Sequence, residues 1–138
     1  MALTEFQRTV CRLIAKNRLV TEGSYVAGGA ALNTLLDAPR LSRDIDLFHD
    51  TVEALRVSWE RDRLLLLKNG FEISLIRQSE AYVEALVGRE GQEVLLQWVR
   101  DSAFRFFPLQ PDEELGAVLH PFDLATNKVL ALVGRLEV

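Results

Sequence analysis

Several kinds of residue are scarce in this chain, and each scarcity excludes a class of function. The sequence has one cysteine, Cys11, and two histidines, His49 and His120. A single cysteine forms no internal disulfide, and these three residues lack the spacing of a zinc site. No apolar run reaches the roughly 20 residues that span a bilayer, and charged residues interrupt the amino-terminal stretch where a signal peptide would lie. The sequence therefore predicts a cytoplasmic protein that has no contact with membranes.

Lysine is also scarce, and acidic residues outnumber basic ones. Of the 16 basic residues three are lysine and thirteen are arginine, and the formal net charge is −4. Binding that coats nucleic acid depends on neutralising many phosphates, so this balance argues against a broad basic surface. Arginine suits planar, two-pronged contacts with phosphate, so the composition is compatible with a local patch of arginines that binds phosphate.

The hydrophobic pattern predicts one α+β (mixed α/β) domain over residues 1–138, with helices flanking one mixed sheet. Helical spacing predicts helices over 4–16, 30–36 and 122–136, and a further helix that starts near a capping pair, Asp50 and Glu53, and ends at Asn69 and Gly70. Alternation predicts strands over 24–27, 44–48, 71–77, 81–88 and 93–100, and the last two form a hairpin. Leu55, Trp59 and Trp98 are expected in the core.

The short segment "RDIDLF" places two acidic residues at strand spacing. Side chains alternate along a strand, so Asp44 and Asp46 share one face while Ile45 and Leu47 point to the other. Two adjacent carboxylates repel each other, and a divalent cation such as Mg²⁺ relieves the repulsion while leaving room for substrate phosphates. The alternative is an exposed edge strand whose acids are solvated.

A pair of glycines, Gly28 and Gly29, stands between the strand 24–27 and the predicted helix 30–36. Without side chains, the backbone can approach a phosphate there, and the free N–H groups of the helix start attract it. The chain has neither a P-loop nor a G-x-G-x-x-G motif. Any tight strand-to-helix turn could use the same two residues.

Together, "VAGGAALN" and "RLSRDIDLF" resemble the nucleotidyltransferase superfamily of the DNA polymerase β type. The serine in "SRDIDLF" and the late helix "HPFDLATNKVLALVGR" are similar to the AbiEii group, bacterial nucleotidyltransferase toxins of abortive-infection and type IV toxin–antitoxin systems. The resemblance implies a polymerase β-like core that transfers a nucleotide from an NTP to an acceptor hydroxyl with two Mg²⁺ ions. RNA or tRNA is the expected acceptor, and an antitoxin protein is an expected partner.

The resemblance also assigns roles to individual residues. Gly28 and Gly29 would hold the triphosphate with Ser42 beside it, and Asp44 and Asp46 would bind the metal ions and act in catalysis. The family places a third carboxylate on a later strand, here 93–100. Gln97 matches that position and is not an acid, so the role either moves to Asp101 or has lapsed.

Lys128 lies within the apolar helix predicted over 122–136. A lysine at the rim of a core is a common structural feature. The resemblance favours a lysine that contacts the phosphates of the nucleotide as a point charge. His49, which follows the acidic strand, is expected to be a structural histidine rather than a ligand.

The family motif continues beyond the point where this chain ends, at Val138 within a strong helix. We therefore expect the domain to be truncated at its carboxyl end. Two alternatives to the RNA-directed enzyme stay open: a nucleotide-binding or protein-interaction module with an inactive site, which Gln97 favours, and a nucleotidyltransferase that acts on a small molecule, as the antibiotic-modifying enzymes do.

Overall fold

The computed structural model describes residues 4–21, 23–27, 44–101, 105–112 and 115–136. These ranges contain helices α1 (Glu5–Val20), α3 (Val52–Lys68) and α4 (Pro121–Leu136), and strands β1 (Ser24–Ala27), β2 (Asp44–His49), β3 (Glu72–Gln78), β4 (Tyr82–Arg89), β5 (Gln92–Arg100), β6 (Gln110–Asp112) and β7 (Gly116–Val118). The predicted helix 30–36, the glycine pair Gly28 and Gly29, and Ser42 lie outside the described residues.

The seven strands form one mixed sheet in the order β3-β4-β5-β2-β1-β7-β6. β2 runs parallel to β5, and β1 runs parallel to β7. The pairs β1–β2, β3–β4, β4–β5 and β6–β7 are antiparallel. The mixed α/β fold predicted from the sequence is therefore confirmed, and β2 lies in the interior of the sheet.

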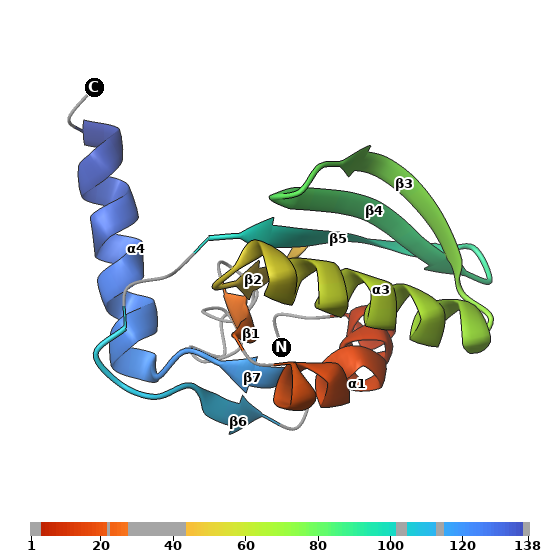
Figure 1. Cartoon of the computed structure of the whole chain (residues 1–138), viewed down its shortest axis with the longest axis horizontal. Helices are drawn as coiled ribbons and strands as arrows, with labels where there is room; N and C mark the ends of the chain where they lie inside the picture. The colour runs from red at the N-terminus through yellow and green to blue at the C-terminus, as the bar shows by residue number, and fades with distance from the viewer. Residues whose placement is uncertain (1–3, 22, 28–43, 102–104, 113–114, 137–138) are drawn as a thin grey trace.

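Helices α1 and α3 pack side by side on one face of this sheet (Figure 1). A capping box starts α1: Gln7 N donates to Thr4 Oγ1, and Thr4 N donates to Gln7 Oε1. Thr51 caps α3 by accepting a hydrogen bond from Ala54 N at 3.0 Å, so the predicted start at Asp50 is one residue early. Asn69 ends α3, as predicted.

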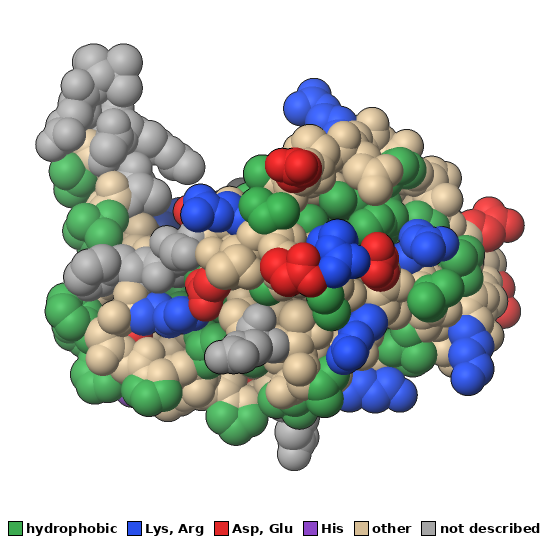
Figure 2. All heavy atoms as spheres, in the orientation of Figure 1, with side chains coloured by type: hydrophobic (Ala, Val, Ile, Leu, Met, Phe, Trp, Pro, Cys, Tyr) green, Lys and Arg blue, Asp and Glu red, His purple; other side chains and the backbone are tan. Residues whose placement is uncertain are grey.

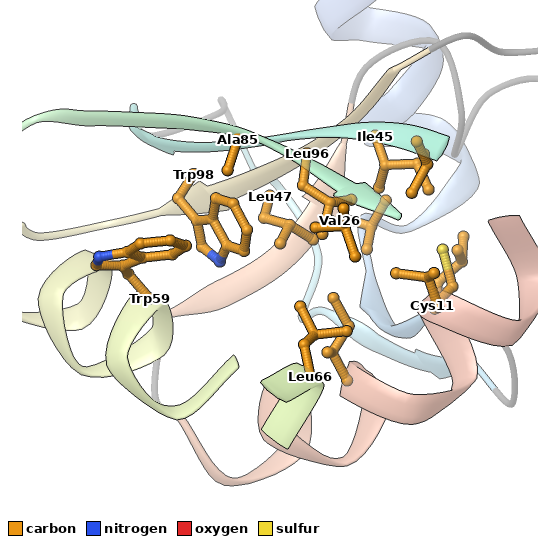
Figure 3. Close-up of a cluster of buried hydrophobic side chains, with 14 of the residues drawn as sticks. Cys11, Val26, Ile45, Leu47, Trp59, Leu66, Ala85, Leu96 and Trp98 are labelled. Carbon is orange, nitrogen blue, oxygen red and sulfur yellow. The ribbon is translucent and has the colours of Figure 1, made fainter. Parts of the chain in front are cut away.

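The core lies between the sheet and these two helices (Figure 3). Trp98 of β5 is fully buried, and its ring centroid lies 4.7 Å from that of Trp59 of α3 in an edge-to-face arrangement. Leu55 and the thiol of Cys11 are buried in the same cluster. The residues expected to pack rather than to act chemically are confirmed as core.

A buried polar cluster around Asp62 joins α1, α3 and β5. The Asp62 carboxylate accepts hydrogen bonds from Asn17 Nδ2 at 2.8 Å, Arg18 Nη2 at 2.6 Å and Trp98 Nε1 at 2.8 Å. The side chains of Arg18 and Asp62 are both 0% exposed. Buried charges of this kind are retained only when they are paired and hydrogen-bonded, so the cluster ties both helices to the sheet.

Helix α4 stands beyond the carboxyl end of β5, apart from α1 and α3 (Figure 1). Its first turn is anchored by Asp123, which accepts hydrogen bonds from the backbone N–H groups of Phe106 and Phe107 at 2.9 and 3.0 Å. On the face shown in Figure 2, acidic and basic side chains are interspersed, and hydrophobic side chains are exposed along α4. Within the described ranges, no helix is long and apolar enough to cross a membrane.

Candidate functional site

Strand β2 places Asp44 and Asp46 on the face of the sheet that is opposite α1 and α3. Ile45 and Leu47, which alternate with them, are buried in the core between the sheet and the helices. Asp44 is exposed and Asp46 is partly buried. The two carboxylates therefore share one face, as the strand spacing predicts.

The position of β2 within the sheet contradicts one part of the structural alternative, the edge strand, while Asp44 is exposed to solvent as that alternative expects. An exposed edge strand with solvated acids would have one unpaired side, but β2 is hydrogen-bonded to β1 on one side and to β5 on the other. The acidic pair thus lies near the centre of a seven-stranded sheet. Asp46 is partly buried beside a second carboxylate, and an adjacent cation would stabilise this arrangement.

The electrostatic environment of Asp44 and Asp46 also favours a bound cation. Burial, and then the negative charge of Asp44, raise the pKa of the Asp46 carboxyl above its ordinary value of 3.8. The fold therefore disfavours the ionised form of Asp46, which an adjacent divalent cation would stabilise. Carboxylate oxygens are the ligands that Mg²⁺ prefers, so the donor set fits this ion. Among the described residues no group of three His, Cys, Asp or Glu side chains is placed to hold a metal.

The segment that leads into the glycine pair also lies beside Asp46. Ala27, the last residue of β1, is the antiparallel partner of Asp46 in the sheet. Residues 28–43 are outside the described part of the chain, so the predicted roles of Gly28, Gly29 and Ser42 stay predictions. Because Gly28 is bonded directly to Ala27, the chain nevertheless enters this segment next to the acidic pair.

Gln97 of β5, rather than Asp101, is the neighbour of Asp46. The parallel pairing of β2 and β5 puts Asp46 opposite Gln97. Asp101 is exposed and follows the end of β5, and its backbone N–H donates to the carbonyl of His49 at 3.1 Å. Four residues of extended chain separate it from Gln97, about 13 Å. A catalytic role of Asp101 stays a prediction that this register does not favour.

Glu84 and Tyr82 of β4 belong to no sequence motif, and they lie in the same region of the sheet. Glu84 is the antiparallel partner of Gln97. Its Oε2 atom accepts hydrogen bonds from Gln97 Nε2 at 2.8 Å and from the Tyr82 hydroxyl at 2.7 Å. A signal for this pairing is present in the sequence, because the two-residue turn Glu90–Gly91 fixes the register of the hairpin.

Lys128 is exposed on α4, the helix that stands beyond the end of β5. Its exposure agrees with either predicted use, a lysine at the rim of an apolar helix or one that reaches a bound phosphate. The contact of Lys128 with a nucleotide stays a prediction.

His49, at the end of β2, is a structural residue. It is fully buried, with Nε2 3.1 Å from the hydroxyl of Ser24 and Nδ1 3.3 Å from the carbonyl oxygen of Val99. A carbonyl oxygen only accepts, so Nδ1 carries the proton and Nε2 is the acceptor for Ser24. Burial, and then the charge of Arg18, lower the pKa of His49 from 6.5 to about 3. Both nitrogens are engaged within the fold, in agreement with the predicted structural role.

This lowered pKa predicts how stability depends on pH. Between pH 6.5 and about 3 the unfolded chain binds a proton at His49 that the folded chain does not, so acid favours unfolding. We expect this residue alone to lower the free energy of unfolding by about 2 kcal/mol between pH 6.5 and 4.5. Urea unfolding of the wild type and of His49→Gln, measured over this pH range, separates the contribution of His49 to the free energy of unfolding from that of the carboxylates. Equal slopes in the two proteins would contradict a neutral buried His49.

Comparison with solved structures identifies the class of fold. The architecture is that of nucleotidyltransferases: the chain superposes on a protein from H. pylori provisionally described as a nucleotidyltransferase, with a TM-score of 0.63 and 19% identity over 90% of this chain and 56% of that one. It also matches JHP933 from Helicobacter pylori, with a TM-score of 0.64 and 20% identity over 94% of this chain and 58% of that one.

A third match is a toxin. MenT4, the nucleotidyltransferase toxin Rv2826c from Mycobacterium tuberculosis H37Rv, gives a TM-score of 0.50 and 17% identity over 71% of this chain and 37% of that one. No family model and no curated protein matches the sequence. At these identities the likeness establishes the fold, and the resemblance to nucleotidyltransferases found in the sequence is confirmed at that level. The chain spans a little over half the length of the two H. pylori proteins.

Proposed function

We propose that this chain is the nucleotide-transferring domain of a metal-dependent nucleotidyltransferase of the AbiEii toxin type. It would pass a nucleotide from an NTP to an acceptor hydroxyl on RNA, tRNA in particular. The observation that carries the proposal is the acidic pair of an interior strand, whose member Asp46 pairs with the residue that precedes Gly28. With this pairing, a phosphate-binding turn that begins at Gly28 would start beside the proposed metal ligands.

Each residue has a defined task in this proposal. Asp44 and Asp46 hold Mg²⁺, which when bound neutralises the phosphate charge and activates the attacking oxygen. The backbone N–H groups at Gly28 and Gly29 bind the triphosphate, with Ser42 beside it. Lys128 contributes a positive charge to the phosphates. The protein supplies position and charge complementarity, and no covalent intermediate is formed on the chain.

A toxin of this type would act in the cytoplasm, where it meets both NTPs and RNA, and an antitoxin protein would restrain it. The toxin MenT4 shares the fold. The alternative is a nucleotide-binding module that has lost turnover, and one observation favours it: the residue beside Asp46 on β5 is Gln97, a neutral side chain.

Transfer of label from NTPs tests the proposal. The protein is incubated with each α-³²P-labelled NTP and Mg²⁺, and the acceptor is either total RNA or a set of aminoglycosides. The RNA is then separated on a denaturing gel. Label on RNA, dependent on Mg²⁺, supports the enzyme. Saturable NTP binding without transfer to RNA or to aminoglycosides supports the inactive module, and transfer to the aminoglycosides alone supports the small-molecule enzyme. If the protein neither binds an NTP nor transfers label, all three hypotheses are contradicted.

A further inference from the structure

Three oxygen-bearing side chains lie in a row across the face of the sheet that carries the acidic pair. Gln97 of β5 is the cross-strand partner of Asp46 on β2 and of Glu84 on β4. Directly opposite residues on neighbouring strands have Cβ atoms about 5 Å apart, so the side chain of Gln97 is within reach of both neighbours. The contacts on its Glu84 side are defined, and they determine how the amide is turned.

The Gln97 amide has its nitrogen toward Glu84. Nε2 donates to Glu84 Oε2 at 2.8 Å. Glu84 Oε2 also accepts a hydrogen bond from the Tyr82 hydroxyl, so this oxygen acts as an acceptor toward both neighbours. The reversed amide would place its carbonyl oxygen against a carboxylate, where two acceptors repel each other. The carbonyl oxygen Oε1 must therefore point away from Glu84.

Tyr82 holds Glu84 in place. Its hydroxyl donates to the same Oε2 atom at 2.7 Å. Burial, and then the hydrogen bond to Glu84, raise the pKa of Tyr82 to about 12, so the hydroxyl keeps its proton over the range in which enzymes work. Two donors thus converge on one oxygen of Glu84, and the orientation of the amide is set by the chain Tyr82–Glu84–Gln97.

We propose that Glu84 is a positioning residue that turns the Gln97 amide so that its carbonyl oxygen serves as a neutral ligand to the cation held by Asp44 and Asp46. The inference rests on the proposed function. Side-chain amide oxygens are ordinary ligands of hard cations, and partners behind a ligand commonly fix its orientation. Two carboxylates and one neutral oxygen balance the charge of one divalent ion, so a second ion would require the charge of the bound triphosphate.

The test uses Mn²⁺ as the probe and the complete chain without nucleotide. The Kd is measured from the electron paramagnetic resonance signal of free Mn²⁺ for the wild type, Glu84→Ala, Gln97→Ala and the double variant. Each single change is expected to raise the Kd about tenfold, the lower end of the range for residues that orient a ligand. The double variant is expected to match Gln97→Ala, because Glu84 acts only through Gln97.

Two further variants separate orientation from charge. Glu84→Gln keeps an oxygen that accepts from Gln97 and should bind Mn²⁺ within about threefold of the wild type. Glu93→Ala removes an equal charge from an exposed position four residues before Gln97 on β5, about 13 Å away, and should change the Kd less than twofold. Thermal unfolding of every variant shows whether the fold is kept.

Wild-type affinity in Glu84→Ala would overturn the inference. A further loss when Glu84→Ala is added to Gln97→Ala would also overturn it, since Glu84 would then act on the cation directly. If the wild type binds no Mn²⁺, or binds it equally well after Asp46→Asn, the metal assignment of the proposed function itself fails. The two failures are distinct, because one is seen in the wild type and Asp46→Asn and the other only in the Glu84 series.

Discussion

Replacing Asp62 by alanine is expected to lower the free energy of unfolding by about 3–5 kcal/mol, the usual cost of breaking a buried ion pair. The Asp62 carboxylate is the acceptor for Arg18 at 2.6 Å, Asn17 at 2.8 Å and Trp98 at 2.8 Å. Alanine removes this shared acceptor and leaves the charge of Arg18 in the core, with the neutral Ser58 Oγ at 2.7 Å as the remaining acceptor of Nη2. Domains of this size have a total stability of about 5–15 kcal/mol, so the loss is a large fraction of it. Urea denaturation followed by far-ultraviolet circular dichroism measures the change.

An exposed acid two residues earlier on α3 is the matched control. Glu60 pairs with Arg56 at 3.4 Å, and its side chain is 53% exposed. Glu60→Ala should therefore change the free energy of unfolding by less than about 1 kcal/mol. Arg18→Met combined with Asp62→Asn removes the buried charge and leaves an acceptor for Trp98, so it should be more stable than Asp62→Asn alone. A cost below about 1 kcal/mol for Asp62→Ala would show that the cluster does not hold the helices to the sheet.

The same cluster explains why hydrophobic spacing predicts too short a first helix. Hydrophobic spacing ended the first helix near Lys16, whereas α1 continues to Val20. The last turn includes Arg18, which is buried against α3, where Asp62, 44 residues away in the sequence, and Ser58 accept its hydrogen bonds. A pattern of apolar residues contains no signal for a buried charge whose partner lies on another helix. The sequence pattern does not predict β6 either, because this strand contains Pro111. Proline is compatible with a sheet only in an edge strand, as here, or at the start of a strand.

Local geometry made other parts of the site predictable. Alternation alone gives the shared face of Asp44 and Asp46. The hairpin β4–β5 turns at Glu90 and Gly91 with φ of 54° and 80°, and this two-residue turn fixes Glu84 opposite Gln97. No turn fixes the parallel pairing of β2 with β5, so the position of Gln97 beside Asp46 followed only from the resemblance to known nucleotidyltransferases.

Asp46→Asn is expected to reduce nucleotide transfer by about 10³-fold or more, which corresponds to about 4 kcal/mol of transition-state stabilisation. The amide is neutral and a weaker ligand for Mg²⁺, so the proposed cation would be lost. The rate of label transfer from NTP to RNA measures the effect. Glu72→Gln, which neutralises an exposed acid on the edge strand β3, should transfer at the wild-type rate.

The same substitution should not destabilise the fold. Burial, and then the charge of Asp44, raise the pKa of Asp46 above 3.8, so its ionised form is less stable in the folded chain than in the unfolded chain. The raised pKa means that folding favours the proton, and the ionised carboxylate costs stability at pH values above 3.8. Without metal at pH 7, Asp46→Asn is therefore expected to unfold at the same temperature as the wild type or at a higher one. This difference should shrink as the pH falls, because the folded wild type then takes up a proton at Asp46.

Metal ions should reverse that order of stability. A Mg²⁺ concentration ten times the Kd stabilises a protein that binds it only when folded by about 1.4 kcal/mol. The wild type should gain this stability, whereas Asp46→Asn should gain none. A carboxylate kept for packing would give the opposite result, with a loss of stability in the variant and no response to Mg²⁺ in either protein. Activity that survives in Asp46→Asn, together with an unchanged response to Mg²⁺, would show that the acidic pair of β2 holds no catalytic ion.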